Sequence, residues 1–258
     1  MNLGIAGRKA IVCASSRGLG KACARALAEA GCEVVINGRD AKKLESAAAE
    51  LSGSGVKIIP VVADVATAEG QKALLAACPQ PDILVNNNAG PPMRDFRELT
   101  RQQMLDGVVG NMVVAIELIQ KVIDPMCERK FGRIINITSG SVKMPLAGLD
   151  LSSGARAGLT AFLAGVARKV AERNVTINNI LPGAFDTDRL RSTLSKTAEQ
   201  QNKSEAEVAA SRMAGIPAKR FGNPDEFGAA CAFLCSAQAG YITGQNLLID
   251  GGTFNGAF

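Results

Sequence analysis

The sequence predicts an α/β fold in which a doubly wound parallel sheet of about seven strands carries helices on both faces. Short apolar runs of strand length alternate with stretches of helical periodicity from one end of the chain to the other. This alternation is typical of parallel strands joined by right-handed helical crossovers. The 258 residues are 47% hydrophobic but only 4% aromatic, so Ala, Val, Ile and Leu have to form the core. Small and β-branched side chains of this kind suit parallel strands that are covered on both faces.

The expected elements are apolar runs and helical-period stretches between residues that favour turns. The strands are Lys9–Ala14, Glu33–Asn37, Val56–Ala63, Ile83–Asn86, Arg133–Thr138, Thr176–Leu181 and Asn246–Ile249. The helices are Gly18–Ala30, Ala41–Leu51, Ala68–Ala77, Arg101–Ile123, Ser153–Glu172 and Pro224–Ser236. Gly31 ends the first helix, and Asp40 is a suitable N-cap for the second. No repeat or linker interrupts this order, so residues 1–258 are expected to form one domain, with the polar region 185–215 as an insertion that lids the site.

Charge and composition exclude several functional classes. The net charge of +5 comes without a run of five or more Lys and Arg, so neither nucleic acid nor membrane is an expected partner. Histidine is absent, which excludes Ser-His-Asp and Cys-His catalysis and His-ligated zinc, and no metal site is expected. Seven scattered Cys without a CxxC pair, together with the lack of a signal-peptide pattern, favour a cytoplasmic location.

A glycine-rich turn follows the first expected strand. The segment Cys13–Gly20 reads CASSRGLG and opens the first helix, so its backbone amides and the helix N-terminus can face a pyrophosphate. A plain tight turn would also account for this composition. The position of the segment, in the first β-α-β unit, favours phosphate binding and a Rossmann-type dinucleotide fold.

At these residues the chain resembles the short-chain dehydrogenase/reductase family, whose loop reads TGxxxGxG. Gly18 and Gly20 match this pattern, whereas Cys13 and Ala14 replace its Thr and first Gly, and the methyl group of Ala14 is expected to crowd the turn slightly. The resemblance covers about residues 5–253, and its C-terminal segments look like the 3-oxoacyl-carrier-protein reductase branch. In the loop it implies cofactor contacts from Ala14, Ser16, Arg17, Gly18, Leu19 and Gly20.

The end of the second expected strand indicates which dinucleotide is bound. A protein selective for NAD usually has an acidic residue there for the ribose 2′-hydroxyl, but this chain has no acid before Asp40. It offers Arg39 instead, with Arg17 in the facing loop, and two guanidinium groups suit a 2′-phosphate. Either Arg alone would be an ordinary surface charge, but the pair favours NADP(H) over NAD(H).

The resemblance also implies cofactor contacts further along the chain. The segment Asp82–Gly90 reads DILVNNNAG and matches the family's Asn-Asn-Ala-Gly with one Asn in surplus, so the equivalent pair is either Asn86–Asn87 or Asn87–Asn88. Turn chemistry at a strand end would explain these Asn residues equally well. The implied contacts outside the loop are Arg39, Asp64, Val65, Asn87, Asn88, Ala89, Ile137, Arg156, Pro182, Gly183 and Thr187.

The catalytic segment departs from the family. Asn111 fits the family's helix Asn that holds a water molecule in a proton relay, and Ser139 fits its Ser that hydrogen-bonds the substrate carbonyl. In the family a Tyr follows this Ser by about thirteen residues and donates the proton, with a Lys four residues further on. Those positions hold Ser152 and Arg156 here, and the single Tyr, Tyr241, lies in the C-terminal segment.

Another group therefore has to supply the proton if the protein is an enzyme. Arg156 can bind ribose hydroxyls but stays protonated, and Ser152 alone is too weak an acid to replace a phenol. Lys143, just beyond Ser139, can donate a proton or polarise a carbonyl. A solvated loop charge is an equally good interpretation of Lys143.

We expect an NADP(H)-dependent oxidoreductase that interconverts a carbonyl and a secondary alcohol and resembles a 3-oxoacyl reductase. The alternative is a catalytically impaired dinucleotide-binding protein that senses or scaffolds, and a lyase or isomerase on this fold is a third interpretation. The helices Arg101–Ile123 and Ser153–Glu172 carry apolar residues beyond one face, and the family pairs such helices between subunits. A homotetramer or homodimer is therefore expected, and the sequence does not identify the small-molecule substrate.

Overall fold

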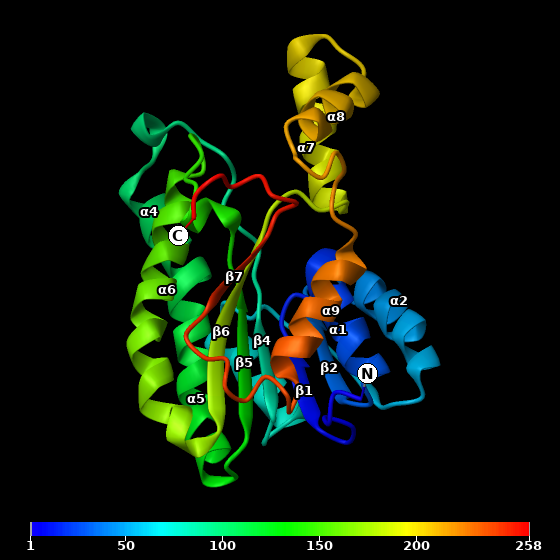
Figure 1. The fold of residues 1–258 in the computed structure, drawn as a ribbon, viewed down its shortest axis with the longest axis vertical. Helices are drawn as coiled ribbons and strands as arrows, with labels where there is room; N and C mark the ends of the chain where they lie inside the picture. The colour runs from blue at the N-terminus through cyan, green and yellow to red at the C-terminus, as the bar shows by residue number, and fades with distance from the viewer. Residues whose placement is uncertain (1, 258) are drawn as a thin grey trace.

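The computed structural model describes residues 2–257 and contains a seven-stranded sheet in which neighbouring strands run parallel (Figure 1). The strands lie in the order β3-β2-β1-β4-β5-β6-β7, so the order of connection reverses between β1 and β4. Their bounds are β1 Lys9–Val12, β2 Glu33–Gly38, β3 Ile58–Val62, β4 Ile83–Asn86, β5 Gly132–Ile137, β6 Val175–Pro182 and β7 Asn246–Ile249. The predicted doubly wound sheet is confirmed, and in this fold class ligands bind at the carboxyl edge where the order reverses.

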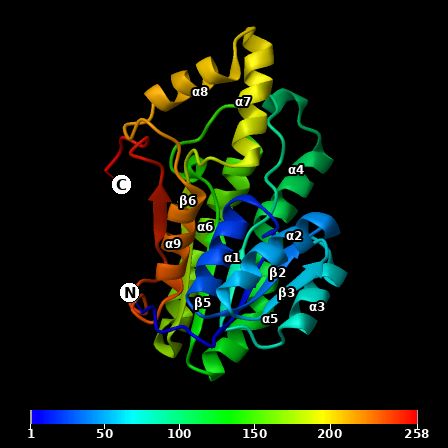
Figure 2. The same ribbon diagram turned by 90° about the vertical axis from the view of Figure 1, so that its right-hand side faces the viewer.

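Helices cover both faces of the sheet. α1, α2 and α9 lie on one face, as Figure 2 shows, and α3, α5 and α6 lie on the other. The helices are α1 Gly18–Glu29, α2 Ala41–Leu51, α3 Ala68–Ala77, α4 Arg101–Val108, α5 Val114–Glu128, α6 Asp150–Val170, α7 Asp188–Gln201, α8 Glu205–Ala214 and α9 Pro224–Cys235. In the part of the chain that the structure describes, no helix combines the length and the apolar composition needed to cross a membrane.

Alternate residues of each strand face opposite layers, which produces two hydrophobic cores. Ala10 and Val12 of β1 pack in the core under α1, α2 and α9, whereas Ile11 packs in the core under α5 and α6. Gly228 lets α9 approach α1 closely, because a Cβ there would lie 2.4 Å from the carbonyl oxygen of Ala22. The helices on this face therefore form a tightly packed layer that supports β1 and the loop after it.

The predicted helix Arg101–Ile123 is wrong as a continuous element. The structure divides it into α4 and α5, which a π turn over Val109–Val113 separates. The side-chain amide of Asn111 donates to the carbonyl oxygen of Gly107 over 3.0 Å and competes with the regular helical hydrogen bonds. At Gly107 the chain also meets α6, since a Cβ there would lie 2.5 Å from the side chain of Leu151. Local competition and close packing together interrupt the helix.

The polar region 185–215 is helical. α7 and α8 form a hairpin that stands off the carboxyl edge of the sheet (Figure 1). The hydroxyl of Thr187 caps α7, and Ser204 with Glu207 forms a capping box at the start of α8. A small apolar cluster that includes Leu190 and Val208 joins the two helices.

A row of four asparagine side chains crosses the sheet near its carboxyl edge. Asn86 of β4, Asn136 of β5, Asn179 of β6 and Asn246 of β7 occupy paired positions on neighbouring strands. Each Nδ2 donates to the Oδ1 of the next side chain, over 2.9, 3.0 and 2.8 Å in order. The first three side chains are buried, and a buried amide that loses its partner costs about 1–3 kcal/mol. The row therefore fixes the register of four strands.

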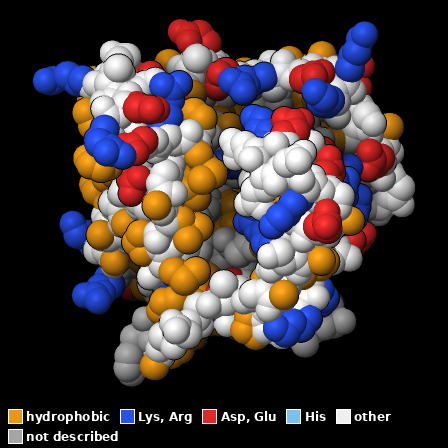
Figure 3. Space-filling model, turned by 90° about the horizontal axis from the view of Figure 1, so that it is seen from above, with side chains coloured by type: hydrophobic (Ala, Val, Ile, Leu, Met, Phe, Trp, Pro, Cys, Tyr) orange, Lys and Arg blue, Asp and Glu red, His pale blue; other side chains and the backbone are white. Residues whose placement is uncertain are grey.

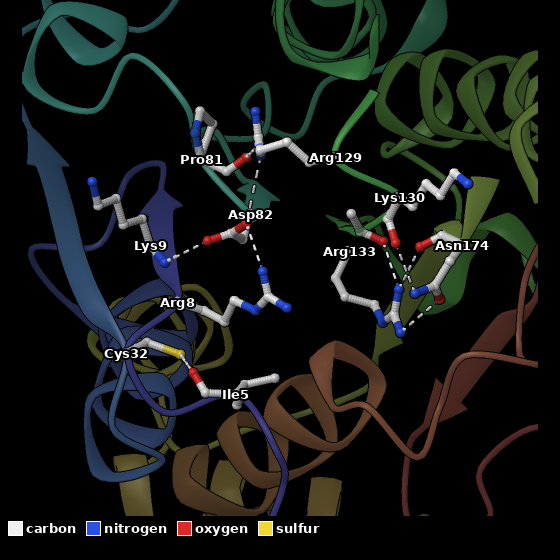
Figure 4. Close-up of polar contacts among 11 residues, drawn as sticks. Ile5, Arg8, Lys9, Cys32, Pro81, Asp82, Arg129, Lys130, Arg133 and Asn174 are labelled. Carbon is white, nitrogen blue, oxygen red and sulfur yellow. Dashed lines mark hydrogen bonds and ion pairs between the residues drawn. The ribbon is translucent and has the colours of Figure 1, made fainter. Parts of the chain in front are cut away.

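The opposite end of the sheet is held by charged side chains (Figure 4). Asp82, just before β4, accepts hydrogen bonds from the backbone N–H of Lys9 over 3.1 Å and from the guanidinium of Arg8 over 3.2 Å. Arg133 is almost fully buried, and its guanidinium donates to backbone carbonyl oxygens that include that of Asn174, 2.9 Å away. These contacts join β1, β4 and β5 at the end of the molecule that lies away from the carboxyl edge.

Replacing Asn179 by Ala removes two hydrogen bonds from the middle of the asparagine row and leaves the buried amide of Asn136 poorly satisfied. We expect Asn179→Ala to lower the free energy of unfolding by about 2–3 kcal/mol in urea denaturation. The comparison variant is Asn246→Ala at the exposed end of the row, which removes one hydrogen bond instead of two and should cost about 1 kcal/mol, less than Asn179→Ala. Equal losses in the two variants would contradict a register-fixing role.

Candidate active site

The loop between β1 and α1, named the phosphate loop after its predicted role, forms a cradle of unpaired backbone amides. Within residues 2–257, no acceptor takes a hydrogen bond from the N–H groups of residues 16–20, where α1 begins. A Cβ at Gly20 would lie 2.4 Å from the carbonyl oxygen of Ala14 and 2.9 Å from Nδ2 of Asn87. The start of α1 therefore packs closely against the backbone of Ala14 and the side chain of Asn87. Free amides at a helix N-terminus bind phosphate groups. The predicted loop residues Ser16, Arg17, Gly18 and Leu19 all lie in this cradle.

Ala14 adopts a left-handed backbone conformation, so its effect is larger than the slight crowding that the sequence analysis predicts. Its φ is +45°, where a residue other than Gly is strained by about 1–2 kcal/mol. Asn37 supports this conformation, because its Oδ1 accepts from the N–H of Ala14 over 3.3 Å. The Nδ2 of the same buried side chain donates to the carbonyl oxygens of Val61 and Ala63. Asn37 thus ties the loop to β2 and β3.

Arg17 and Arg39 lie along one edge of this cradle. A Cβ at Gly38 would lie 3.0 Å from the hydroxyl of Ser16, so the loop and the end of β2 are in contact. Arg17 and Arg39 directly follow these two residues, and both side chains are exposed. Arg39 also pairs with Asp64 over 3.5 Å. Among residues 2–257, Arg17 has no carboxylate within 4.0 Å.

The three consecutive asparagines at the end of β4 differ in their contacts. Asn86 belongs to the row across the sheet. Asn87 donates from Nδ2 to the carbonyl oxygen of Ala14 over 3.1 Å, and Asn88 donates to a carbonyl oxygen of the π turn over 3.0 Å. The N–H of Ala89 donates to Oδ1 of Asn88 over 2.8 Å. Asn87 and Asn88 therefore join the phosphate loop to the π turn, whereas Asn86 is part of the sheet.

A polar pocket lies beneath the π turn, between the ends of β4 and β5 and helix α6. Its lining includes Val65, Asn86, Asn111, Ile137 and Arg156. The Oδ1 atoms of Asn86 and Asn111 are buried without a hydrogen-bond donor from residues 2–257. A water molecule that shares two to four polar partners satisfies such atoms. The unpaired oxygen atoms of the pocket could therefore hold the water molecule that a relay through Asn111 requires.

Arg156 carries a buried positive charge into this pocket. Only 7% of the residue is exposed, and its guanidinium donates to the carbonyl oxygen of Ile137 over 2.7 Å and to the hydroxyl of Ser152 over 3.2 Å. Within residues 2–257, no carboxylate lies within 4.0 Å of this guanidinium. Burial lowers the pKa of Arg156 to about 10, and the nearby cation of Arg189 adds to this effect. A buried charge of this kind calls for a polar or anionic ligand.

Ser139 has a hydroxyl that is free to donate. Its Oγ accepts hydrogen bonds from the backbone N–H of Ser141 over 3.1 Å and from the Ser141 hydroxyl over 2.9 Å. In both bonds the oxygen of Ser139 is the acceptor, so its hydroxyl proton remains available for a hydrogen bond to a substrate oxygen. Ser152 likewise accepts from Arg156 and keeps its own proton. Ser141 is buried and was not predicted, and its only signal in the sequence is its place two residues after Ser139.

Lys143 is not in contact with the other candidate catalytic residues. Its Nζ lies 5.6 Å from the centre of the Phe254 ring, within the range of a cation–π interaction. The C-terminal segment therefore holds Lys143 beside the turn that follows β5. In the described part of the chain, no hydrogen bond joins its ammonium group to Ser139, Ser152 or Arg156.

The segment after β6 connects the two halves of the site. The carbonyl oxygen of Pro182 lies 3.2 Å from the position that a Cβ at Gly140 would take, in the turn after β5. The methyl group of Thr187 lies 3.8 Å from the corresponding position at Gly18, in the phosphate loop. Pro182, Gly183 and Thr187 therefore bridge the phosphate loop and the turn that carries Ser139.

Arg189 reaches the site from the first turn of α7 and was not among the predicted residues. Both terminal nitrogens of its guanidinium lie 3.0 Å from the position that a Cβ at Gly90 would take, so this side chain covers the backbone after β4. It also lowers the pKa of Arg156, as a like charge in the vicinity should. The only signal in the sequence is its position two residues after Thr187, and composition and periodicity do not distinguish it from its neighbours.

The surface is hollowed at this end of the molecule (Figure 3). Hydrophobic side chains dominate the wall on the side of α4, whereas Lys, Arg, Asp and Glu side chains all lie on the side of α7 and α8. Large hydrophobic side chains are exposed before α4, at Met93 and Phe96, and before α6, at Met144 and Leu146. The hollow is therefore apolar on one side and carries charges of both signs on the other.

Comparison with known proteins finds relatives over the whole chain. Residues 13–253 match the family described as enoyl-(acyl carrier protein) reductase. The chain is 31% identical to the 3-oxoacyl-(acyl-carrier-protein) reductase FabG of Vibrio cholerae, over 98% of this chain and 99% of that protein. It is 30% identical to the NADPH-dependent reductase BacG of Bacillus subtilis, over 95% and 97% respectively. The structure of L-sorbose reductase from Gluconobacter frateurii, complexed with NADPH and L-sorbose, has a TM-score of 0.94 and 29% identity, over 99% of this chain and all of that one.

Proposed function

The chain belongs to the short-chain dehydrogenase/reductase family, and on this premise we propose that it is an NADPH-dependent reductase that converts a carbonyl compound into a secondary alcohol. The observation that carries the proposal is that Asn87 lines the pocket that contains Arg156 and also donates to Ala14 beside the amide cradle. The NADPH named for BacG and for L-sorbose reductase supports this cofactor. The similarity to FabG over the full length favours 3-oxoacyl compounds as the substrate class.

The residues present fit a dinucleotide. The free amides of residues 16–20 would hold the diphosphate, and Arg17 with Arg39 would bind the 2′-phosphate. Arg156, a buried cation without a carboxylate, would bind the hydroxyls of the nicotinamide ribose. The other residues assigned to the cofactor are Asp64 and Val65 at the adenine, with Asn87, Asn88, Ala89, Ile137, Pro182, Gly183 and Thr187. When bound, the dihydronicotinamide supplies the hydride.

The protein's own residues then orient and protonate the carbonyl. Ser139 donates a hydrogen bond to the carbonyl oxygen, and a water molecule on Asn111 belongs to the proton path. We assign the proton donor to Lys143, since Ser152 and Arg156 stand at the spacing of the family's Tyr and Lys. The α7–α8 hairpin, over residues 185–215, acts as a lid on this site.

Removing Arg39 should change cofactor preference. We expect Arg39→Ala to weaken NADPH binding by about tenfold or more and to leave NADH binding nearly unchanged, because a charge-assisted contact with the 2′-phosphate is lost. Cofactor fluorescence titrations measure both dissociation constants, and Lys42→Ala, another exposed cation nearby, is the matched control. Equal NADPH and NADH affinities in the unaltered protein would refute the assignment.

Removing Lys143 should affect catalysis and not cofactor binding. Lys143→Ala is expected to reduce turnover by about a hundredfold or more in a spectrophotometric NADPH assay over a carbonyl panel, with NADPH affinity nearly unchanged. Arg156→Ala should instead weaken cofactor binding. If Lys143→Ala leaves turnover unaltered, Lys143 is not the donor. The double variant with Ser152→Tyr and Arg156→Lys should then increase carbonyl reduction, because the fold is arranged for that pair.

A second function is supported by the observation that the chain's single Tyr, Tyr241, is fully exposed, and by the prediction that Ser152 and Arg156 stand where the family has its proton-transfer residues. A dinucleotide-binding protein with a sensing or scaffolding role would retain the amide cradle but would not need the family's Tyr as a proton donor. Tight NADPH binding without turnover of any carbonyl in the panel would favour this function over the first.

We also propose that the protein forms a homodimer or homotetramer. Large hydrophobic side chains are exposed on α4, on the π turn and on α6: Met104, Leu105, Val108, Val109 and Phe162. Exposed apolar surface of this extent marks an interaction site more often than a free surface. Light scattering at micromolar concentration should give the mass of two or four chains, and Phe162→Glu should shift it toward one chain. A monomer in the unaltered protein would contradict the proposal.

A further inference from the structure

Two guanidinium groups of the site have no carboxylate partner. Arg156 is buried in the pocket, and Arg189 covers the backbone of Gly90 at the mouth of the same region. Within residues 2–257, neither has an Asp or Glu oxygen within 4.0 Å. Like charges at this proximity repel, and the lowered pKa of Arg156 reflects this repulsion in addition to burial. The site therefore has an excess of positive charge that an anion would relieve.

The contacts of α7 distinguish Arg189 from an ordinary surface cation. Asp186 and Asp188 flank it in the sequence, but both pair with Arg191, over 3.0 and 3.6 Å. Arg191 is thus neutralised on the outer side of the helix, whereas Arg189 turns toward Gly90 and has no acidic partner. Both cations are exposed, but Arg191 pairs with two carboxylates, whereas Arg189 lies against Gly90 without a carboxylate within 4.0 Å in the part of the chain that the structure describes.

The phosphates of the cofactor have other partners. The free amides of residues 16–20 and the N-terminus of α1 lie on one side of Asn87, and Arg17 and Arg39 lie further along that edge. Gly90 follows beyond Asn88, which is hydrogen-bonded to the π turn on the side of the Arg156 pocket. Arg189 therefore lies over Gly90, beyond the Asn88 that is hydrogen-bonded to the π turn on the side of the Arg156 pocket.

We infer that the substrate is a free oxo acid, in place of the carrier-linked 3-oxoacyl compound named for FabG, that its carboxylate lies close to the carbonyl that is reduced, and that Arg189 of helix α7 binds this carboxylate. The inference rests on the proposed carbonyl reduction. A guanidinium binds a carboxylate through two parallel hydrogen bonds, and the charge of Arg156 adds attraction from below. Hydride passes from NADPH to the carbonyl carbon and a proton to its oxygen, which yields NADP⁺ and a hydroxy acid with its carboxylate unchanged. The apolar wall near α4 accepts the rest of the molecule.

The experiment compares oxo acids with their methyl esters, for example acetoacetate with methyl acetoacetate, together with the 2-oxo and 4-oxo pairs. The unaltered protein should reduce at least one acid with a kcat/KM about tenfold or more above that of its ester. Arg189→Ala should raise the KM for that acid by about 10- to 100-fold and leave the ester's KM and the NADPH dissociation constant unchanged. Arg189→Lys should retain part of the preference, because it keeps the charge and loses the bidentate geometry. The matched control is Lys196→Ala, another exposed cation of α7, in which the acid's KM should change less than about twofold.

Three outcomes would overturn the inference, and they are separable from failure of the proposed reductase. Esters reduced as well as acids, or an acid preference that survives Arg189→Ala, would show that Arg189 does not bind the substrate. A loss of NADPH affinity in Arg189→Ala would assign Arg189 to the cofactor's diphosphate instead. If neither acids nor esters are reduced, the proposed reaction fails, and calorimetry with the NADP⁺-loaded protein still tests the inference. Binding of the acid that disappears in Arg189→Ala would support it, and no binding to the unaltered protein would refute it.

Discussion

The register of the sheet at its carboxyl edge is the constraint on which the site depends. The row of buried amides that begins at Asn86 and passes through Asn136 and Asn179 fixes this register, because a slip of one residue would turn each amide to the opposite face. Each member is closely followed by residues of the site. Asn87 reaches the phosphate loop directly after Asn86, and the carbonyl of Ile137 that accepts from Arg156 comes directly after Asn136. The row of asparagine amides within the sheet therefore sets the positions of Asn87 and of the Ile137 carbonyl in the candidate site.

The two buried arginines of the structure show two ways of accommodating such a charge. Arg133, at the far end of the sheet, donates to the carbonyl oxygens of Gly132, Asn174 and Ser236 and to the side chain of Asn174, so all three guanidinium nitrogens are hydrogen-bonded even though the cation of Arg8 is nearby. Arg156 has one carbonyl and one hydroxyl as partners, and a second cation, Arg189, is nearby. The guanidinium of Arg133 has its hydrogen-bond partners within the chain. The guanidinium of Arg156 has fewer partners, which is typical of a site that binds a ligand.

The departures from the family pattern fall into two physical kinds. Ala14 is a backbone departure: its left-handed conformation is strained, and the hydrogen bond from its N–H to Asn37 stabilises the conformation. Ser152 and Arg156 are predicted chemical departures: on the proposed alignment they keep the spacing of a phenol and an ammonium group but differ in acidity and hydrogen bonding. The first kind leaves the cradle of amides intact, and the proposed second kind would change which group can move a proton.

The sequence by itself determined the fold class, the seven strands and the position of the glycine-rich loop before the first helix, because these depend on periodicity and on glycine spacing within a few residues. The tertiary structure decided the π turn at Asn111, the row that joins Asn86 to its partners, and the burial of Arg156. It also brought Arg189 over Gly90, about a hundred residues away in the chain. These features depend on the register of strands and the close approach of helices that are distant in sequence, and local propensity carries no signal for either.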